Sequence, residues 1–456
     1  MPGRRSRLPA VKRPRRTTSG ADSARRIALA VAGVLLVGTV ALLAPGSWTT
    51  HRPSVVDALF TAVSALCVTG LTVLDTPSAW TVQGQVVIAM LIQIGGTGVM
   101  TLATLLAMMT AHRLGLRRRM VASTETRGGL AETAAVVRGI IITSAVVETL
   151  VALMLFARLR LQYGMGTAEA AGTAVFHAVS AFNNAGFALF HGNLTEVQTD
   201  AFILLPLAAA VIVGGLGFPV LAELRKRYRA PRRWSLTTKM VLAGTPLLLI
   251  GGAAITVLLE HANPGTLGPM GWPHKVLNAF FHATVSRTAG FNAVDVGAMH
   301  PETWLFTDLM MLVGGGPAGT AGGLKITTLF VLLAVVRSEL RGDPYVLVFG
   351  KRLSRAQHRE VITIVVLMVG AIVVATVAIM LLESASLDRV LLETTSAIST
   401  TGLSTGITSG LSDASKLMLC MLMFAGRVGP MTLGTALALR RRPLLFEPAK
   451  ERTLIG

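Results

Sequence analysis

The chain has 456 residues, of which 52% are hydrophobic and only 14% are charged. A soluble protein of this length would carry much more charge on its surface, so the composition predicts a polytopic membrane protein. The two cysteines, Cys67 and Cys420, form neither a CxxC motif nor a disulfide framework, and they imply no metal site.

In chain order, the sequence begins with an Arg- and Pro-rich segment, residues 1–26, which we expect to be a disordered basic tail. Eight apolar stretches follow, each about as long as the roughly 20 residues that a membrane-spanning helix needs. Five carry no charged residue: 27–45, 84–111, 201–222, 240–259 and 361–382. The other three are 139–157 with Glu148, 304–336 with Asp308 and Lys325, and 415–439 with Lys416 and Arg427.

Basic residues are concentrated in five segments, which hold 33 of the 42 Lys and Arg residues but only nine of the 23 acidic ones. These segments are 1–26, 113–138, 223–239, 337–360 and 440–456. The positive-inside rule places them in the cytoplasm of a bacterial cell, together with both termini. We expect them to contact anionic membrane lipid, and not nucleic acid, because the sequence predicts no folded basic domain.

Four segments of the chain share one pattern, and each ends on a glycine: 60–70, 176–186, 280–290 and 392–402. Six residues before each glycine stands a hydroxyl residue, and we expect these hydroxyls to bind the backbone of a pore helix: Ser64, Ser180, Thr284 and Ser396. The glycines lie 116, 104 and 112 residues apart. This regular spacing predicts four similar units around one axis, with a pore on that axis.

The four predicted units are 27–111, 137–222, 238–336 and 360–439, and residues 440–456 form a cytoplasmic C-terminal tail. In each unit the apolar stretch before the glycine is too short to cross a bilayer, so it predicts a re-entrant helix between two spans. Every unit enters and leaves on the cytoplasmic side, so the repeats are parallel and not inverted. The predicted fold is an all-α polytopic membrane protein with eight spanning helices, in four pseudo-symmetric helix–pore loop–helix units.

The glycine segments have the properties of a filter for a monovalent cation. Rings of backbone carbonyls can replace the hydration shell of such an ion, and the backbone that aims them inward often needs a positive φ, which glycine adopts freely. A filter for divalent cations would more often carry Asp or Glu, and these loops have neither at the positions concerned. The predicted filter residues are Val68, Thr69, Gly70, Asn184, Ala185, Gly186, Thr288, Ala289, Gly290, Thr400, Thr401 and Gly402.

Three of these segments carry a family resemblance: residues 57–72, Phe182-Asn-Asn-Ala-Gly-Phe187 and Arg287-Thr-Ala-Gly-Phe-Asn292. They resemble the pore loops of the Trk/Ktr/HKT potassium transporter superfamily, and the likeness covers nearly the whole chain after the basic tail. Trk-type bacterial subunits usually carry two further spans before the first repeat. This chain has a single span there, so it is most similar to the Ktr-type membrane subunit.

The resemblance implies potassium uptake through one pore per protomer of a homodimer, driven by the membrane potential and often dependent on sodium. It also implies a cytoplasmic RCK-type ring that binds ATP or ADP as a separate regulatory subunit. The chain itself then needs no cofactor, and K⁺, with Na⁺ as a possible second ion, is its substrate.

The second helix of unit three is interrupted between Gly314 and Gly323, which predicts a flexible loop because glycine and proline disfavour a helix. Its glycines also match G-x-G-x-x-G, but no strand precedes them, so a dinucleotide site is not expected. The family resemblance implies that this loop is an intramembrane gate, with Arg427 as a cationic barrier beside it. The predicted gate residues are Gly314, Gly315, Gly316, Pro317, Gly319, Gly322, Gly323, Lys325 and Arg427.

Other intramembrane charges have open roles. Arg427 could instead pair with Asp308 or Glu148, and Arg287 and Glu393 could pair with each other or cap backbone carbonyls.

Three other functions are alternatives to a potassium pore. A voltage-gated channel would need a helix with Arg at every third residue, a secondary transporter of another cation or solute would need inverted repeats, and a membrane enzyme would need converging catalytic side chains. The sequence offers none of these features.

Overall fold

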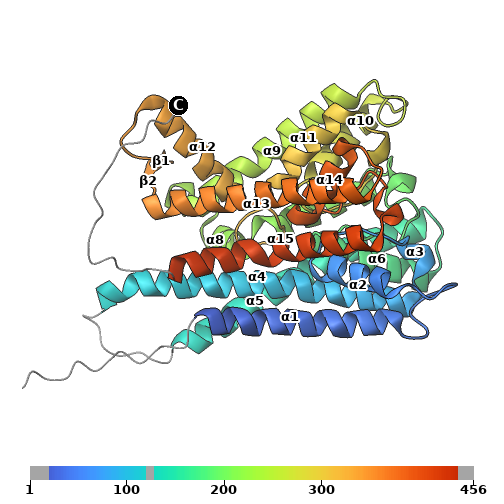
Figure 1. The fold of residues 1–456 in the computed structure, drawn as a ribbon, viewed down its shortest axis with the longest axis horizontal. Coiled ribbons are helices and arrows are strands. Elements are labelled where there is room, and N and C mark those ends of the chain that lie inside the picture. Colours follow the sequence, from blue (N-terminus) through green and yellow to red (C-terminus); the bar gives the residue numbers. More distant parts are fainter. Residues whose placement is uncertain (1–19, 120–127, 440–456) are drawn as a thin grey trace, which may run out of the picture.

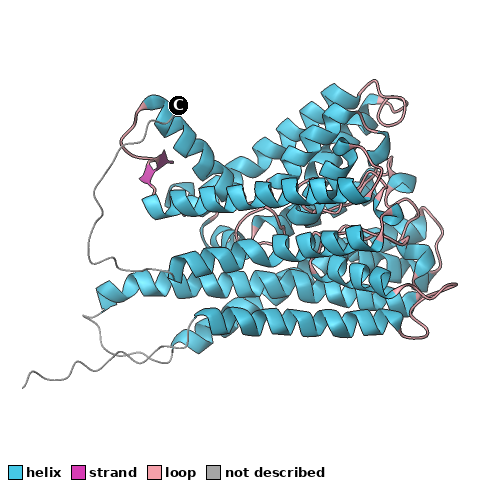
Figure 2. Ribbon diagram, viewed as in Figure 1, coloured by secondary structure: helices cyan, strands magenta, loops and turns pink. Residues whose placement is uncertain are grey.

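The computed structural model describes residues 20–119 and 128–439, and this part of the chain is mostly helical (Figures 1 and 2). Its α-helices are α1 (Gly20–Leu43), α2 (Val55–Leu66), α3 (Thr76–Ala79), α4 (Val82–Arg119), α5 (Gly128–Leu161), α6 (Thr167–Phe182), α7 (Ala201–Leu216), α8 (Phe218–Arg227), α9 (Leu236–Glu260), α10 (Trp272–Val285), α11 (Pro301–Leu312), α12 (Ile326–Arg341), α13 (Arg355–Leu382), α14 (Leu387–Ser399) and α15 (Asp413–Leu439). Two-residue strands β1 (Leu347–Val348) and β2 (Lys351–Arg352) form the antiparallel hairpin drawn in magenta in Figure 2.

The helices follow the predicted order of a first helix, a short helix and a second helix four times over, with the second helix bent in unit two and split in unit three. The short helices α2, α6, α10 and α14 all lie toward one end of the molecule in Figure 1. Each second helix contacts the short helix of the next unit in chain order: α4 contacts α6, α7 contacts α10, α11 contacts α14, and α15 contacts α2. This cyclic packing closes four parallel units into one ring.

An ion pair supports the closure between the fourth and first units. Lys416 Nζ at the start of α15 lies 2.8 Å from the Asp57 carboxylate in the first turn of α2, and both side chains are mostly buried. Because these residues are 359 positions apart in the chain, their pairing joins its two ends into the ring.

Four helical segments are long and apolar enough to span a membrane: Val82–Thr104, Ala134–Leu161, Leu236–Glu260 and Gln357–Leu382. Helices α7 and α8 meet these criteria only as a pair, since they bend by 94° at Gly217. Three further predicted spans are less regular in the described residues. The apolar part of α1 is Val31–Leu43, the third unit's second helix is split into α11 and α12, and α15 carries the charges noted above.

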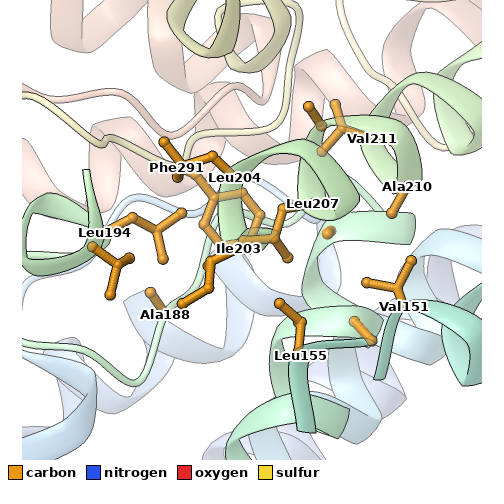
Figure 3. Close-up of a cluster of buried hydrophobic side chains, with 14 of the residues drawn as sticks. Val151, Leu155, Ala188, Leu194, Ile203, Leu204, Leu207, Ala210, Val211 and Phe291 are labelled. Carbon is orange, nitrogen blue, oxygen red and sulfur yellow. The ribbon is translucent and has the colours of Figure 1, made fainter. Parts of the chain in front are cut away.

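The short helices are held by buried apolar cores. Figure 3 shows one of them, a cluster that contains Val151 and Leu155 of α5, Leu204 of α7 and Phe291, with Leu204 beside Phe291. Phe291 directly follows the third glycine, and the residues that follow all four glycines are at most 1% exposed: Leu71, Phe187, Phe291 and Leu403. These apolar anchors fix each glycine loop to the helices around it.

Two features differ from the sequence predictions. Helix α1 begins at Gly20, inside the segment 1–26 that was expected to be disordered, and residues 1–19 lie outside the described residues. Ala21, Ser23 and Ala24 are residue types compatible with a helix, so the helix can begin before the apolar span. The β1–β2 hairpin lies in the basic segment 337–360, where no strand was expected, and the C-terminal tail 440–456 lies outside the described residues.

Candidate functional site

The four glycine loops adopt the same unusual backbone conformation. Each glycine has a positive φ, between 69° and 98°, as the sequence predicts. The residue two positions earlier also has a positive φ in every loop: 56° at Val68, 61° at Asn184, 73° at Thr288 and 52° at Thr400. Three of these four residues are β-branched, for which a left-handed conformation is strained by about 1–3 kcal/mol. The conformation recurs at one register in all four loops and is strained in three of them, which is typical of functional sites.

The four glycines form a closed ring of loops, which we call the glycine ring. A Cβ atom added to any one of them would overlap a carbonyl oxygen of the next loop, and would lie within about 3 Å of its glycine Cα. These contacts run from Gly70 to Ala185, from Gly186 to Ala289, from Gly290 to Thr401 and from Gly402 to Thr69. These contacts bring together eight of the twelve predicted filter residues, namely the four glycines and the residues directly before them.

Buried hydroxyls hold the ring's backbone. Ser64 Oγ accepts a hydrogen bond from the Gly70 N–H at 3.1 Å and donates one to the Leu71 carbonyl at 2.7 Å. Ser180 donates to the Phe187 carbonyl at 2.8 Å, and Ser396 accepts from the Gly402 N–H at 2.9 Å. These three hydroxyls thus bind the loop after the short helix, and the prediction that they bind the helix itself is wrong for them.

Thr284 follows the prediction, since its hydroxyl donates to the Phe280 carbonyl within α10. The third loop is instead held by the Val285 carbonyl, which accepts hydrogen bonds from the N–H groups of Ala289 and Gly290 at 2.9 and 3.3 Å. Unit three is therefore the least regular of the four.

Replacing Ser64 with alanine should destabilise the first loop, because it leaves the buried Gly70 N–H and Leu71 carbonyl without their partner. The expected loss is about 1–3 kcal/mol for each polar group left unpaired. Thermal unfolding of the detergent-solubilised protein would show it as a lower midpoint. Thr256→Val is the matched control, since the Thr256 hydroxyl is buried in α9 and has no partner among the described residues; an equal loss in both variants would contradict the role of Ser64.

Directly against the glycine ring lies the segment that separates α11 from α12, residues 313–325, which we call the broken-helix loop. Its two ends are joined at a neck. The Gly314 N–H donates to the Leu324 carbonyl at 2.8 Å, and the Leu324 N–H donates to the Leu312 carbonyl at 3.0 Å. Between the ends, Ala318 and Gly323 have positive φ values of 56° and 59°, so the segment is a structured loop and not a kinked helix.

One side of the broken-helix loop contacts the residues with left-handed φ in the ring. The Thr320 hydroxyl lies 3.0 Å from Asn184 Oδ1, and the Gly322 N–H donates to Thr288 Oγ1 at 3.1 Å. A Cβ atom added to Gly322 would overlap Thr400 Oγ1. Loops two, three and four of the ring are thus in contact with this segment, which lies across their ends.

The other side of the broken-helix loop fits into the bend between α7 and α8. The Gly316 N–H donates to the Gly215 carbonyl at 2.7 Å, and the Thr320 N–H donates to the Gly214 carbonyl at 3.1 Å. A Cβ atom added to Gly315, Gly316 or Gly217 would overlap backbone carbonyls, that of Pro317 in the case of Gly217. Backbone packs on backbone here, which explains the dense glycine content of both segments.

Basic side chains bind the carbonyls of the broken-helix loop. Arg427 in α15, which is 6% exposed, donates to the Thr320 carbonyl at 2.5 Å and to the Gly95 carbonyl in α4 at 3.3 Å. Lys325 donates to the Ala321 carbonyl at 2.5 Å. All nine predicted gate residues therefore lie in this loop, at its end, or in contact with it.

The intramembrane carboxylates have other partners. In the described part of the chain, Arg427 forms no ion pair with Asp308 or Glu148. Glu148 accepts hydrogen bonds from Ser144 and Asn183, and Asp308 Oδ1 is buried with no hydrogen-bond partner among the described residues. Glu393 accepts hydrogen bonds from residues 404–408 instead of pairing with Arg287, and Arg287 caps the Gly314 carbonyl.

The left-handed backbone conformation of the residues two positions before the glycines was not predicted. Among them only Asn184 is a residue type that tolerates this conformation, and the β-branched side chains of the other three argue against it. Only the fourfold register of the glycines could have drawn attention to these positions.

Comparison with known proteins identifies relatives that are cation transporters. The family model for TrkH, described as a cation transport protein, matches residues 38–441. Ktr system potassium uptake protein B of Bacillus subtilis is 39% identical over 403 residues, 87% of this chain and 89% of that protein. The protein of the same name from Vibrio alginolyticus is 36% identical, covering 95% and 94% of the two chains. The potassium/sodium uptake protein NtpJ of Enterococcus hirae is 33% identical, covering 93% and 94%.

The fold is also that of a solved structure. The crystal structure of the potassium transporter TrkH from Vibrio parahaemolyticus matches with a TM-score of 0.72, covering 94% of this chain and 88% of that one, at 17% sequence identity. The resemblance seen in the glycine segments is thereby confirmed, and a transporter, not an enzyme, is the expected class. With the family model covering most of its length, the chain belongs to the TrkH family of cation transport proteins.

Proposed function

We propose that the protein takes up potassium ions through the glycine ring, which acts as a single-file filter. The observation that carries this proposal is the closed ring of four loops, in which each of the carbonyls of Thr69, Ala185, Ala289 and Thr401 lies against the glycine of the preceding loop. Carbonyl oxygens are the ligands with which a filter replaces the hydration shell of K⁺. Relatives that share more than 30% of their residues over nearly the whole chain are named potassium uptake proteins or, in one case, a potassium/sodium uptake protein.

The broken-helix loop is the proposed gate. It lies across the ends of three ring loops and is held by Arg427 and Lys325, so an ion leaving the ring on that side would meet this segment. It donates two hydrogen bonds to backbone carbonyls of α7 and two to side chains of the ring. Such a loop can be displaced as a unit without breaking a helix, as a gate requires.

The proposed assembly is a homodimer in a bacterial cell membrane, with both termini in the cytoplasm and lipid around the apolar helices. A soluble RCK-type ring that binds ATP or ADP would act on the gate from that side. The names of two relatives support a multi-component arrangement, since they call those proteins part of a Ktr system. Sodium would either activate the protein or move with potassium, as the printed name of the NtpJ relative includes both ions.

Complementation of a potassium-uptake-deficient bacterium tests the function. We expect the chain to restore growth at limiting K⁺, and to do so more strongly with a soluble Ktr-type subunit and with added sodium. Uptake of ⁸⁶Rb⁺ by the same cells measures the flux directly. A chain that reaches the membrane but restores neither growth nor uptake under any of these conditions is not a potassium transporter.

The described structure also bears on the main alternative, a secondary transporter of another solute. That reading needs inverted repeats around a binding site at the membrane centre. The cyclic packing of each second helix on the next unit's short helix is instead that of four parallel repeats around one axis.

A further inference from the structure

The residue three positions before each ring glycine is charged in only one of the four loops. It is occupied by Cys67, Asn183, Arg287 and Ser399, directly at or after the end of each short helix. Arg287 is the only charged residue of the four, and it is 7% exposed. Unit three is also the unit whose second helix is broken.

In the other three units, the second helix touches the short helix through a glycine. A Cβ atom added to Gly95, Gly214 or Gly426 would overlap the carbonyl oxygen of Leu66, Phe182 or Ile398, respectively. Each of these carbonyls lies four residues before the ring glycine, so backbone contact fixes the second helix to the end of the short helix. In unit three, a Cβ atom on Gly314 would instead meet carbonyls of its own loop, those of Gly322 and Leu324.

Arg287 replaces this missing contact. Its Nη2 donates a hydrogen bond to the Gly314 carbonyl at 3.0 Å. Gly314 is at the neck of the broken-helix loop, where its own N–H binds Leu324. The next residue, Thr288, accepts a hydrogen bond from Gly322 at the other end of the loop. Two consecutive residues of the third ring loop therefore hold both ends of the broken-helix loop.

The surroundings of Arg287 give this bond its strength. Its Nε has no hydrogen-bond partner, and in the described part of the chain no carboxylate pairs with it. The side chain borders a narrow cavity lined also by Thr245, Thr284 and Gly315. A buried guanidinium is costly unless its donors are used, so displacement of Gly314 would leave this cation without its carbonyl partner.

We infer that Arg287 is a positioning residue that couples the third loop of the filter to the gate, by holding the Gly314 carbonyl while the broken-helix loop is closed. The inference rests on the proposed function and adds a regulatory link to it. An ion bound in the ring would contact Ala289 and Gly290, which directly follow Arg287 and Thr288 in the chain. A shift of the third loop on ion binding would then be transmitted by Arg287 and Thr288 to the neck of the broken-helix loop. Opening of the loop breaks the Arg287 bond.

Substitutions at Arg287 test the coupling in proteoliposomes that contain the membrane protein without a soluble subunit. Arg287→Met keeps much of the length of the side chain but removes all of its hydrogen-bond donors. It should raise ⁸⁶Rb⁺ flux about tenfold or more, because the closed loop loses a hydrogen bond from a charged donor, whose contribution exceeds the roughly 1.4 kcal/mol that corresponds to a factor of ten. Arg287→Lys, which keeps one charged donor, should raise it less. Ser399→Ala is the control, because this residue has the same position in unit four and its hydroxyl has no partner among the described residues.

A merely structural role would instead lower the flux and the thermal unfolding midpoint together. If Arg287→Met is poorly folded, Arg287→Gln serves as the second variant, with the same expected direction. Flux at or below the wild-type level in every folded variant overturns the coupling.

A double variant separates this inference from the proposed gate. Deletion of residues 317–320 removes the tip of the broken-helix loop, and in that background Arg287→Met should add no further flux, since both changes release the same segment. If the two effects multiply, Arg287 acts elsewhere and the coupling is wrong while the gate stands. If the deletion alone leaves the flux unchanged, the proposed gate itself is wrong.

Discussion

Gly70→Ser should remove most of the discrimination between K⁺ and Na⁺ and reduce K⁺ uptake at least about tenfold. Gly70 has a φ of 93°, which an L side chain rarely adopts. Its Cβ would overlap the Ala185 carbonyl oxygen and lie 3.1 Å from the Gly186 Cα. Because both of these atoms belong to the next loop of the ring, the added side chain must push two proposed ion-binding loops apart. Strain of this kind costs about 1–3 kcal/mol, enough for a tenfold effect or more.

Gly406→Ser separates crowding in the ring from backbone strain. Gly406 follows the fourth loop and has a nearly identical φ of 90°, but a Cβ added there meets no atom within 4 Å. The Gly406 variant should show a modest loss of stability with unchanged ion preference. Competition of Na⁺ with ⁸⁶Rb⁺ uptake measures that preference in both variants. An unchanged preference in Gly70→Ser, at normal expression, would rule out the ring as the filter.

The positions of the ring residues could be predicted from the sequence because a glycine marks the same position in every unit. Glycine alone tolerates the positive φ and the close approach of the next loop, so Gly70 and its three counterparts had to stand at the same place in every unit. The number of units and their parallel order also followed from local signals, namely apolar length and the distribution of Lys and Arg. These signals depend on the bilayer more than on any particular contact.

The contacts that shape the ring could not be predicted from the sequence. Val68, Thr288 and Thr400 adopt a conformation that their β-branched side chains disfavour, so local preference predicts the opposite of what the ring imposes. The partner of Ser64 was misjudged for a related reason. A serine in a helix ordinarily binds the preceding turn, and only the folded-back loop supplies the Gly70 N–H and the Leu71 carbonyl.

The partners of the buried charges depend on tertiary structure in the same way. Arg427 was a candidate for pairing with Asp308 or Glu148, and Arg287 for either pairing with Glu393 or capping backbone carbonyls; both bind backbone carbonyls of the broken-helix loop. A non-helical segment has carbonyls that no helix satisfies, and a guanidinium can supply the missing donors. The broken helix therefore accounts for these arginines, although a scan for opposite charges points elsewhere.

Deletion of residues 317–320 should raise K⁺ flux by tenfold or more in the absence of any soluble subunit. These residues form the tip of the broken-helix loop and carry its contact with the second ring loop and its contact with α15. Thr320 lies 3.0 Å from Asn184 Oδ1 through its hydroxyl, and its carbonyl accepts the hydrogen bond from Arg427. The deletion leaves the neck at Gly314 and Leu324 intact, so α11 and α12 keep their connection. Uptake of ⁸⁶Rb⁺ into proteoliposomes measures the flux.

Replacement of the same four residues by four glycines distinguishes two ways in which the loop could close the pathway. If its bulk alone blocks the ions, the glycine loop has the wild-type length and should stay closed. If the Thr320 hydroxyl and the stiffness of Pro317 hold it in place, the glycine loop loses both and should leak almost as much as the deletion, although it keeps the carbonyl of residue 320 that accepts the hydrogen bond from Arg427. We expect the second result, because glycine adds conformational freedom to the open state of the loop and removes the side-chain contact with the ring. A deletion variant that reaches the membrane and conducts no more than the wild type would show that the gate lies elsewhere.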